Sequence, residues 1–302
     1  MQRGFLAIGF ALMLVAVLSW GASFVWLKMA LATLPPGGLA ALRFSIASLV
    51  LLVLAVAVPG SRRQLRQRSL WPTLVSIGLL GTFLPNLLQN YGMLFLGAGI
   101  SGVVQGLGPI YTSILAVTFL GEGFGLRKRT GSAMAFCGTI LLSLGLYGVG
   151  RSSLLGVILV TLSAVAYSAY TVAVRRSLLE AIHPLALLAG TTACGALGLL
   201  LYAVIVEPID PILSMGISEI KIVLALVIFP TLLAYGCYVM ALSRLEASRA
   251  AAFIFLVPVS ALLLGGIYLG ERLSLDQVLC SVLIVVGVAV AESEKQRGRN
   301  LA

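Results

Sequence analysis

The side chains best suited to recognise a small molecule are amides that recur at helical spacing inside apolar segments. Asn86, Gln89 and Asn90 stand at positions i, i+3 and i+4 and therefore share one face of a helix, and Gln105 lies in the next apolar segment. A buried amide costs free energy unless it is hydrogen-bonded. These amides therefore predict either bonds between helices or bonds to the amino and carboxylate groups of a solute, and the spacing leaves both open.

Aromatic side chains follow the same spacing. Three pairs lie three positions apart, so that each pair shares a helix face: Trp20 with Ser23, Tyr167 with Tyr170, and Tyr235 with Tyr238. An aromatic cavity wall would suit aromatic or aliphatic groups, or cations held over the ring faces. Ordinary core packing, or a belt at the membrane interface, is the alternative interpretation.

Arg43 is the one basic residue inside an apolar segment. An intramembrane charge is by default a functional candidate, and in a cavity it could hold the carboxylate of a solute. Because Arg43 lies near the end of its segment, a side chain that extends to the interface is the alternative.

Glu122 and Glu271 end two apolar segments, each preceded by a glycine. A carboxylate in a loop near a helix N-terminus is stabilised by the helix dipole. We therefore expect a structural role for both residues rather than proton transfer.

Four prolines interrupt apolar segments, and they fall in corresponding segments of the two halves of the chain: Pro85, Pro109, Pro230 and Pro258. A proline within a helix removes a backbone hydrogen bond and kinks the helix. We predict that the kinked helices line a pathway and bend during gating. Static kinks that serve packing are the alternative.

Chemistry by an enzyme is not indicated. His183 is the single histidine, no carboxylate pair stands near it, and the four cysteines show no CxxC spacing. No Walker motif is present. We expect no catalytic residue, no metal, no cofactor and no ATP-driven step.

Composition indicates a membrane protein. Of the 302 residues, 60% are hydrophobic and 10% are charged, whereas soluble proteins carry roughly 25% charged residues. A spanning helix needs about 20 mostly apolar residues. The sequence predicts an all-α integral membrane protein with ten transmembrane helices, multi-pass in a bacterial inner membrane: 5–27, 37–58, 71–95, 98–120, 130–149, 154–174, 184–206, 222–242, 250–269 and 273–291.

The basic residues predict the orientation. With the N-terminus inside, 15 Lys and Arg residues fall in inside segments and four in outside segments. Positive charge collects on the cytoplasmic side, so we expect both termini to be cytoplasmic. The same distribution accounts for the net charge of +10 without a nucleic acid partner.

The two halves of the chain are related by a shift of 149 positions. Leu120-Gly121-Glu122 then meets Leu269-Gly270-Glu271, and Pro109 meets Pro258. Five spans in each half is an odd number, so the halves, 1–150 and 151–302, must cross the membrane in opposite directions. Inverted five-helix repeats are common in secondary transporters, whose substrate sites lie between the repeats.

These motifs resemble those of a known family. Residues 20–24 read Trp-Gly-Ala-Ser-Phe, residues 41–44 read Ala-Leu-Arg-Phe, and each half contains a proline followed by Leu-Gly-Glu. The chain resembles the EamA-type branch of the drug/metabolite transporter superfamily over nearly its whole length. The resemblance implies ten helices in two inverted five-helix repeats, a central cavity, and transport of amino acids, other metabolites or drugs. Within the branch, the chain is most similar to amino-acid exporters of the YddG type.

Residues 5–27 contain no Asp or Glu, and a proton relay normally needs buried ionisable groups. We therefore expect a facilitator that exports a neutral or zwitterionic small molecule, by preference an amino acid, through alternating access. A proton-coupled drug or metabolite exporter is the alternative, and a membrane-embedded enzyme or a receptor is less well supported. The expected partners are the small-molecule substrate and the lipid bilayer. The oligomeric state is open, with a monomer allowed.

Overall fold

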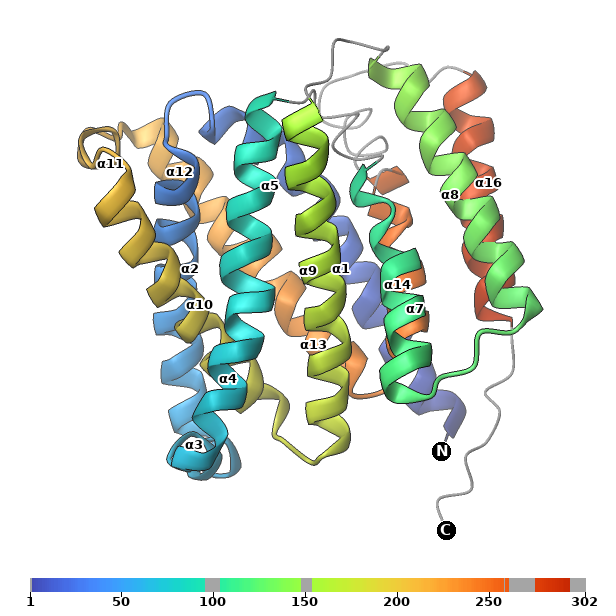
Figure 1. The fold of residues 1–302 in the computed structure, drawn as a ribbon, viewed down its shortest axis with the longest axis horizontal. Helices are drawn as coiled ribbons and strands as arrows, with labels where there is room; N and C mark the ends of the chain where they lie inside the picture. Colours follow the sequence, from blue (N-terminus) through green and yellow to red (C-terminus); the bar gives the residue numbers. More distant parts are fainter. Residues whose placement is uncertain (1, 96–103, 148–153, 258, 261–274, 294–302) are drawn as a thin grey trace.

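The computed structural model describes residues 2–95, 104–147, 154–257, 259–260 and 275–293. Within these ranges every regular element is a helix and no strand occurs. The helices stand side by side along a common direction, as a bundle (Figure 1). The expectation of an all-helical protein is confirmed.

The first half contains α1 (Gln2–Ala30), α2 (Pro36–Ala57), α3 (Pro59–Leu65), η1 (Arg68–Leu70), α4 (Trp71–Gly78), η2 (Leu79–Phe83), α5 (Leu84–Phe95), α7 (Gly108–Leu120) and α8 (Leu126–Tyr147). The second half contains α9 (Leu154–Leu179), α10 (Pro184–Val206), α11 (Asp210–Leu213), α12 (Ile217–Leu226), η3 (Val227–Leu233), α13 (Ala234–Leu242), α14 (Ala247–Ile254) and α16 (Leu275–Glu292).

Six helical segments are long and apolar enough to cross a membrane: Phe5–Ser23, Pro36–Ala57, Arg68–Phe95, Leu154–Leu179, Pro184–Val206 and Ile217–Leu242. Gly108–Leu120 and Val278–Ala291 are shorter apolar helices. The chain is thus a multi-pass membrane protein. The full count of ten spans stays a prediction, because the span expected at 250–269 is described only as far as residue 260.

Proline begins several of the helices. Pro36 and Pro184 occupy the first turn of α2 and α10, where the missing N–H would have no partner in any case. His183 caps α10, because its Nδ1 accepts a hydrogen bond from the backbone N–H of Leu185 at 3.2 Å. The single histidine therefore has a structural partner.

The expected kinks take a specific form at two positions. Residues 79–83 and 227–233 form the π-helical segments η2 and η3, and a shift of 149 places η2 within η3. Pro230 lies inside η3, and Pro85 is the second residue of the helix that follows η2. The helical segments Arg68–Phe95 and Ile217–Leu242 therefore change their hydrogen-bond pattern at corresponding positions. Such π-helical interruptions are frequent at functional sites.

Pro109 does not kink a continuous helix. Residues 106–107 form a turn, and α7 begins at Gly108, which places Pro109 in the first turn of that helix. A proline is well tolerated there, because its φ angle suits the helix and its missing N–H leaves no carbonyl unpaired. The span is interrupted as expected, but by a turn at residues 106–107 and not by a bend within a continuous helix. Pro258 lies outside the described residues.

α8 and α16 pack so closely that their backbones meet. A Cβ atom on Gly131 would stand 2.3 Å from the backbone nitrogen of Ala291, and one on Gly287 would stand 2.5 Å from that of Ala135. Only glycine allows this approach. Gly287 and its repeat counterpart Gly138 both lie in this interface.

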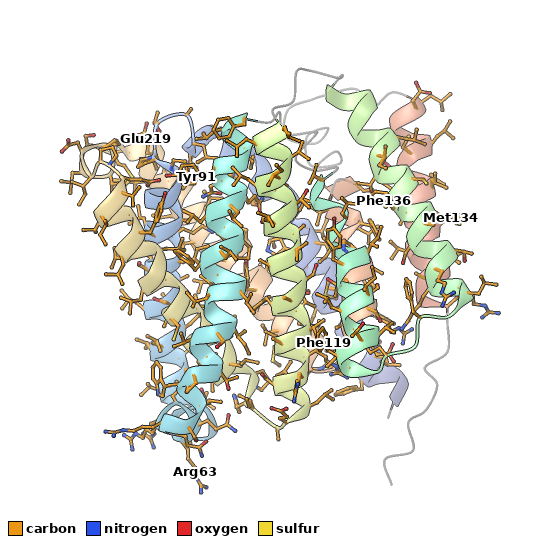
Figure 2. The ribbon with its side chains drawn as sticks, in the orientation of Figure 1. Arg63, Tyr91, Phe119, Met134, Phe136 and Glu219 are labelled. Carbon is orange, nitrogen blue, oxygen red and sulfur yellow. The ribbon has the colours of Figure 1, made fainter. Side chains whose placement is uncertain are left out.

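α1 begins and α16 ends at the same edge of the bundle, which also carries α3 (Figure 1). We call this edge the N-terminal face. Arg63 lies at this edge and Glu219 at the opposite one (Figure 2).

The charge bias and the fold together make a testable prediction of orientation. Arg63 and Ser218 are both exposed, on opposite faces of the bundle. In a variant lacking the native cysteines, Arg63→Cys on the predicted cytoplasmic face should resist an impermeant maleimide in intact cells. Ser218→Cys on the predicted outer face should react. Labelling of Arg63→Cys with protection of Ser218→Cys would reverse the predicted orientation.

Candidate functional site

A pocket that is partly open to solvent lies within the bundle, and its empty space, the open part included, is about 880 Å³. Its described lining comes from both halves of the chain: Trp20, Ser23, Leu27, Arg43, Pro85, Asn86, Gln89, Asn90, Gln105, Gly108, Thr112, Ala164, Tyr167, Tyr235, Ile254 and Val257. The structure thus brings together most of the residues that the sequence singles out.

Five aromatic rings form one cluster at the pocket. Trp20 meets Tyr235 at a centroid distance of 5.7 Å and Tyr238 at 5.3 Å, both edge to face. Tyr167 stacks on Tyr238 at 5.9 Å and lies 5.4 Å from Tyr170. Tyr170 and Tyr238 are 1% and 0% exposed. They therefore support the wall from behind, and Trp20, Tyr167 and Tyr235 form its surface.

The π-helical segment η3 fixes the position of Trp20. The indole Nε1 donates a hydrogen bond to the carbonyl of Pro230 at 3.1 Å. Pro230 thus does not line the pocket itself but orients a ring that does. Ser23 lines the pocket, although its hydroxyl donates to the carbonyl of Trp20 at 2.7 Å.

Arg43 points into the pocket rather than toward the membrane interface. It is 7% exposed, and its guanidinium carbon lies 4.7 Å from the centre of the Phe44 ring. No described carboxylate forms an ion pair with it. Arg43 is the one charged residue of the described lining, and a buried cation without a counter-ion is energetically unfavourable.

Thr231 holds Arg43 in place, and the neighbouring proline explains why its hydroxyl is oriented to do so. Pro230 has no N–H, so the carbonyl of Leu226 lacks its usual α-helical partner four residues later. The Thr231 hydroxyl donates to that carbonyl at 2.7 Å. Its single proton is then committed, and its oxygen accepts from Arg43 Nε at 2.5 Å.

All four amides, Asn86, Gln89, Asn90 and Gln105, line the pocket, and two of them also bond to the protein backbone. Asn90 Nδ2 donates to the carbonyl of Pro36 at 2.9 Å and so ties α5 to α2. Asn86 Nδ2 donates to the carbonyl of Thr82, in the preceding segment η2. Gln105 differs, because its buried Oε1 has no hydrogen-bond partner.

Carboxylates are absent from the described lining. Glu122 instead accepts hydrogen bonds from the backbone N–H groups of Ala247 and Ser248, at 2.7 Å and 3.0 Å. This contact with the start of α14 is the structural role expected for it. Glu271 lies outside the described residues.

Sequence reasoning overlooked three hydroxyl residues that shape the pocket. Thr231 fixes Arg43, Thr112 belongs to the lining, and Ser163 donates to the carbonyl of Pro85 at 2.8 Å. A hydroxyl residue directly after a mid-span proline, as in Pro230-Thr231, is the signal that could have revealed the first. The other two have no such signal in the sequence, and the partner of Ser163 lies 78 positions away.

A family model matches both halves of this chain. The model of the EamA-like transporter family matches residues 7–144 and again residues 154–292. The chain belongs to the EamA-like transporter family. The resemblance of its motifs to that family is thereby confirmed, and its general activity is transport.

Individual relatives agree with this assignment. An uncharacterized transporter of Archaeoglobus fulgidus is 31% identical over 91% of this chain and 95% of its own length. A probable amino-acid metabolite efflux pump of Salmonella typhimurium is 26% identical over 93% of each chain. A solved crystal structure superposes with a TM-score of 0.80 at 25% identity, covering 96% of this chain and 97% of the other.

The role of Thr231 can be tested by isosteric replacement. Thr231→Val should lower the free energy of unfolding by about 1–3 kcal/mol, because the Leu226 carbonyl and Arg43 both lose a buried partner. Thr231→Ser keeps the hydroxyl and should remain near the parent value. Unfolding in detergent measures both, and equal stability of the Val variant and the parent would contradict the described hydrogen bonds.

Proposed function

We propose that this EamA-family transporter is a facilitator of neutral or zwitterionic amino acids, which it exports across the bacterial inner membrane by alternating access through the pocket. The observation that carries the proposal is the buried Arg43, which faces the pocket with no described carboxylate as partner. A solute carboxylate would supply the missing counter-ion with charge-assisted hydrogen bonds.

The other pocket groups suit the remaining parts of an amino acid. The unpartnered Oε1 of Gln105 would accept a hydrogen bond from the ammonium group. Trp20, Tyr167 and Tyr235 would contact an apolar or aromatic side chain. The Salmonella relative, named as a probable amino-acid metabolite efflux pump, agrees with this substrate class.

The absence of carboxylates from the described lining supports facilitation over proton coupling. Residues 5–27 carry no Asp or Glu either. Arg43 is a poor proton carrier because arginine stays protonated in proteins. The solute would then move down its own gradient, outward when it accumulates in the cell.

Two inverted repeats, at 1–150 and 151–302, would provide the alternation. The double family match and the recurrence of π-helical segments at η2 and η3 support this organisation. The substrate site would lie between the repeats, as in other transporters of this construction. A monomer would be sufficient, because the described lining comes from a single chain.

Proteoliposomes without ion gradients test the proposal. Loaded with an unlabelled neutral amino acid, they should take up the labelled amino acid by exchange, whereas its carboxamide should compete at least about tenfold more weakly because it lacks the charge that Arg43 would bind. An imposed pH gradient should drive no accumulation.

Liposomes without protein, and liposomes with Arg43→Gln, provide the controls. Uphill uptake powered by a proton gradient alone would overturn the facilitator. Exchange of organic cations in place of amino acids would overturn the substrate class.

A further inference from the structure

The junction between α13 and α14 is tightly packed near the N-terminal face, where the Leu245 side chain lies against Gly9 of α1. The buried residues of this junction, all 0% exposed, are Leu242, Leu245, Ala247, Ala250 and Ala251. α14 continues from the junction toward the pocket, where Ile254 belongs to the lining. The start of α14 therefore lies between the pocket and the N-terminal face.

The start of α14 is capped by the other half of the chain. Its own N-cap residue, Glu246, makes no side-chain cap. Glu122 takes that role: besides the N–H groups of Ala247 and Ser248, its carboxylate accepts from the Ser248 hydroxyl at 2.5 Å. A carboxylate at a helix N-terminus also interacts favourably with the helix dipole.

The backbone at Gly121 aims Glu122 at its target. Gly121 ends α7 with a φ of 62°, a left-handed conformation that favours glycine. The next residue leaves the axis of α7 and reaches α14. In the Gly-Glu pair of the first half, Gly121 therefore makes the turn and Glu122 caps α14.

A partly buried ion pair reinforces the same contact. Lys128 lies at the start of α8 and is 6% exposed; its Nζ is 2.6 Å from Glu246 Oε2 and donates to the Ser248 hydroxyl at 3.1 Å. It also donates to the carbonyl of Gly123 at 3.0 Å. Glu122 and Lys128 of the first half therefore hold Glu246, Ala247 and Ser248 of the second.

We propose that this group of five residues, Glu122, Lys128, Glu246, Ala247 and Ser248, is a clamp that holds the pocket closed toward the N-terminal face, and that it separates whenever the pocket opens to that face. Glu122 is a positioning residue, because it acts on the transport pathway through α14. The contact joins the two halves of the chain, and a pocket between halves opens by moving them apart. The proposal rests on membership of a transporter family and holds for any substrate.

Cysteine accessibility tests the clamp directly. In a variant lacking the four native cysteines, Ile254→Cys serves as a reporter inside the pocket. Adding Glu122→Gln should raise its labelling rate by an impermeant maleimide about fivefold to tenfold, from the N-terminal face only, because a lost charged acceptor shifts the population toward the open state. The readout needs no substrate, so its failure would leave the proposed function standing.

Glu180→Gln is the matched control. Glu180 follows the last residue of α9 and forms an exposed ion pair with Arg176 at 3.0 Å, and its replacement should leave the labelling rate unchanged. A folded Glu122→Gln protein labelled at the parent rate would reduce the contact to an ordinary helix cap and overturn the proposal. Equal increases in both variants would overturn it as well.

A milder variant decides the question if Glu122→Gln fails to fold. Ser248→Ala removes the hydroxyl that joins Glu122 and Lys128 but leaves both backbone hydrogen bonds of the carboxylate. It should raise the labelling rate about twofold to threefold from the same face, since two side-chain hydrogen bonds are lost but the charge of Glu122 is kept. No increase in this folded variant would contradict the clamp.

Discussion

The structure depends on one unfavourable feature, a guanidinium buried in an apolar bundle without a counter-ion. Arg43 is 7% exposed and has no described carboxylate as partner. Such a charge is tolerated only where polar atoms, an aromatic face or a bound anion stabilise it. The Thr231 hydroxyl and the Phe44 ring provide two of these contacts. In the proposed function a solute carboxylate would supply the third contact, and the pocket would then favour solutes that carry such a group.

Interrupted helices make this arrangement possible. A regular spanning helix satisfies all its backbone groups internally and has nothing to offer a cavity. At η3 the proline disturbs that pattern, and the disturbed segment engages two side chains of the pocket: the Pro230 carbonyl accepts from Trp20, and Thr231 binds Arg43. At η2 the corresponding change lies directly before Pro85 and Asn86 of the lining. The same local departure from α-helical geometry therefore builds both sides of the pocket, and each is held by partners from other helices.

Apolar runs of spanning length are visible in the sequence because the bilayer demands them, and six of the predicted spans form helices long and apolar enough to cross a membrane. Helical spacing likewise singled out Trp20, Tyr167 and Tyr235, because each has a polar or aromatic residue three positions later on the same helix face. Spacing could not separate Asn90, which ties two helices together, from Gln105, whose acceptor is unpartnered, because that difference depends on helices distant in the sequence. For the same reason no local pattern could show that Glu122 caps a helix of the other half. Arg43 was ambiguous near the end of its span, and only the packed bundle places it in the pocket.

The central claim is that Arg43 binds the carboxylate of the solute, and a thermodynamic cycle tests it most directly. Calorimetry in detergent would compare a neutral aromatic amino acid with its carboxamide, on the parent protein and on Arg43→Gln. The account predicts that the parent prefers the amino acid by about tenfold or more, the usual size of a charge-assisted hydrogen bond, and that the preference disappears in the variant. An undiminished preference in the folded Arg43→Gln protein would show that another group binds the carboxylate, and would contradict the account.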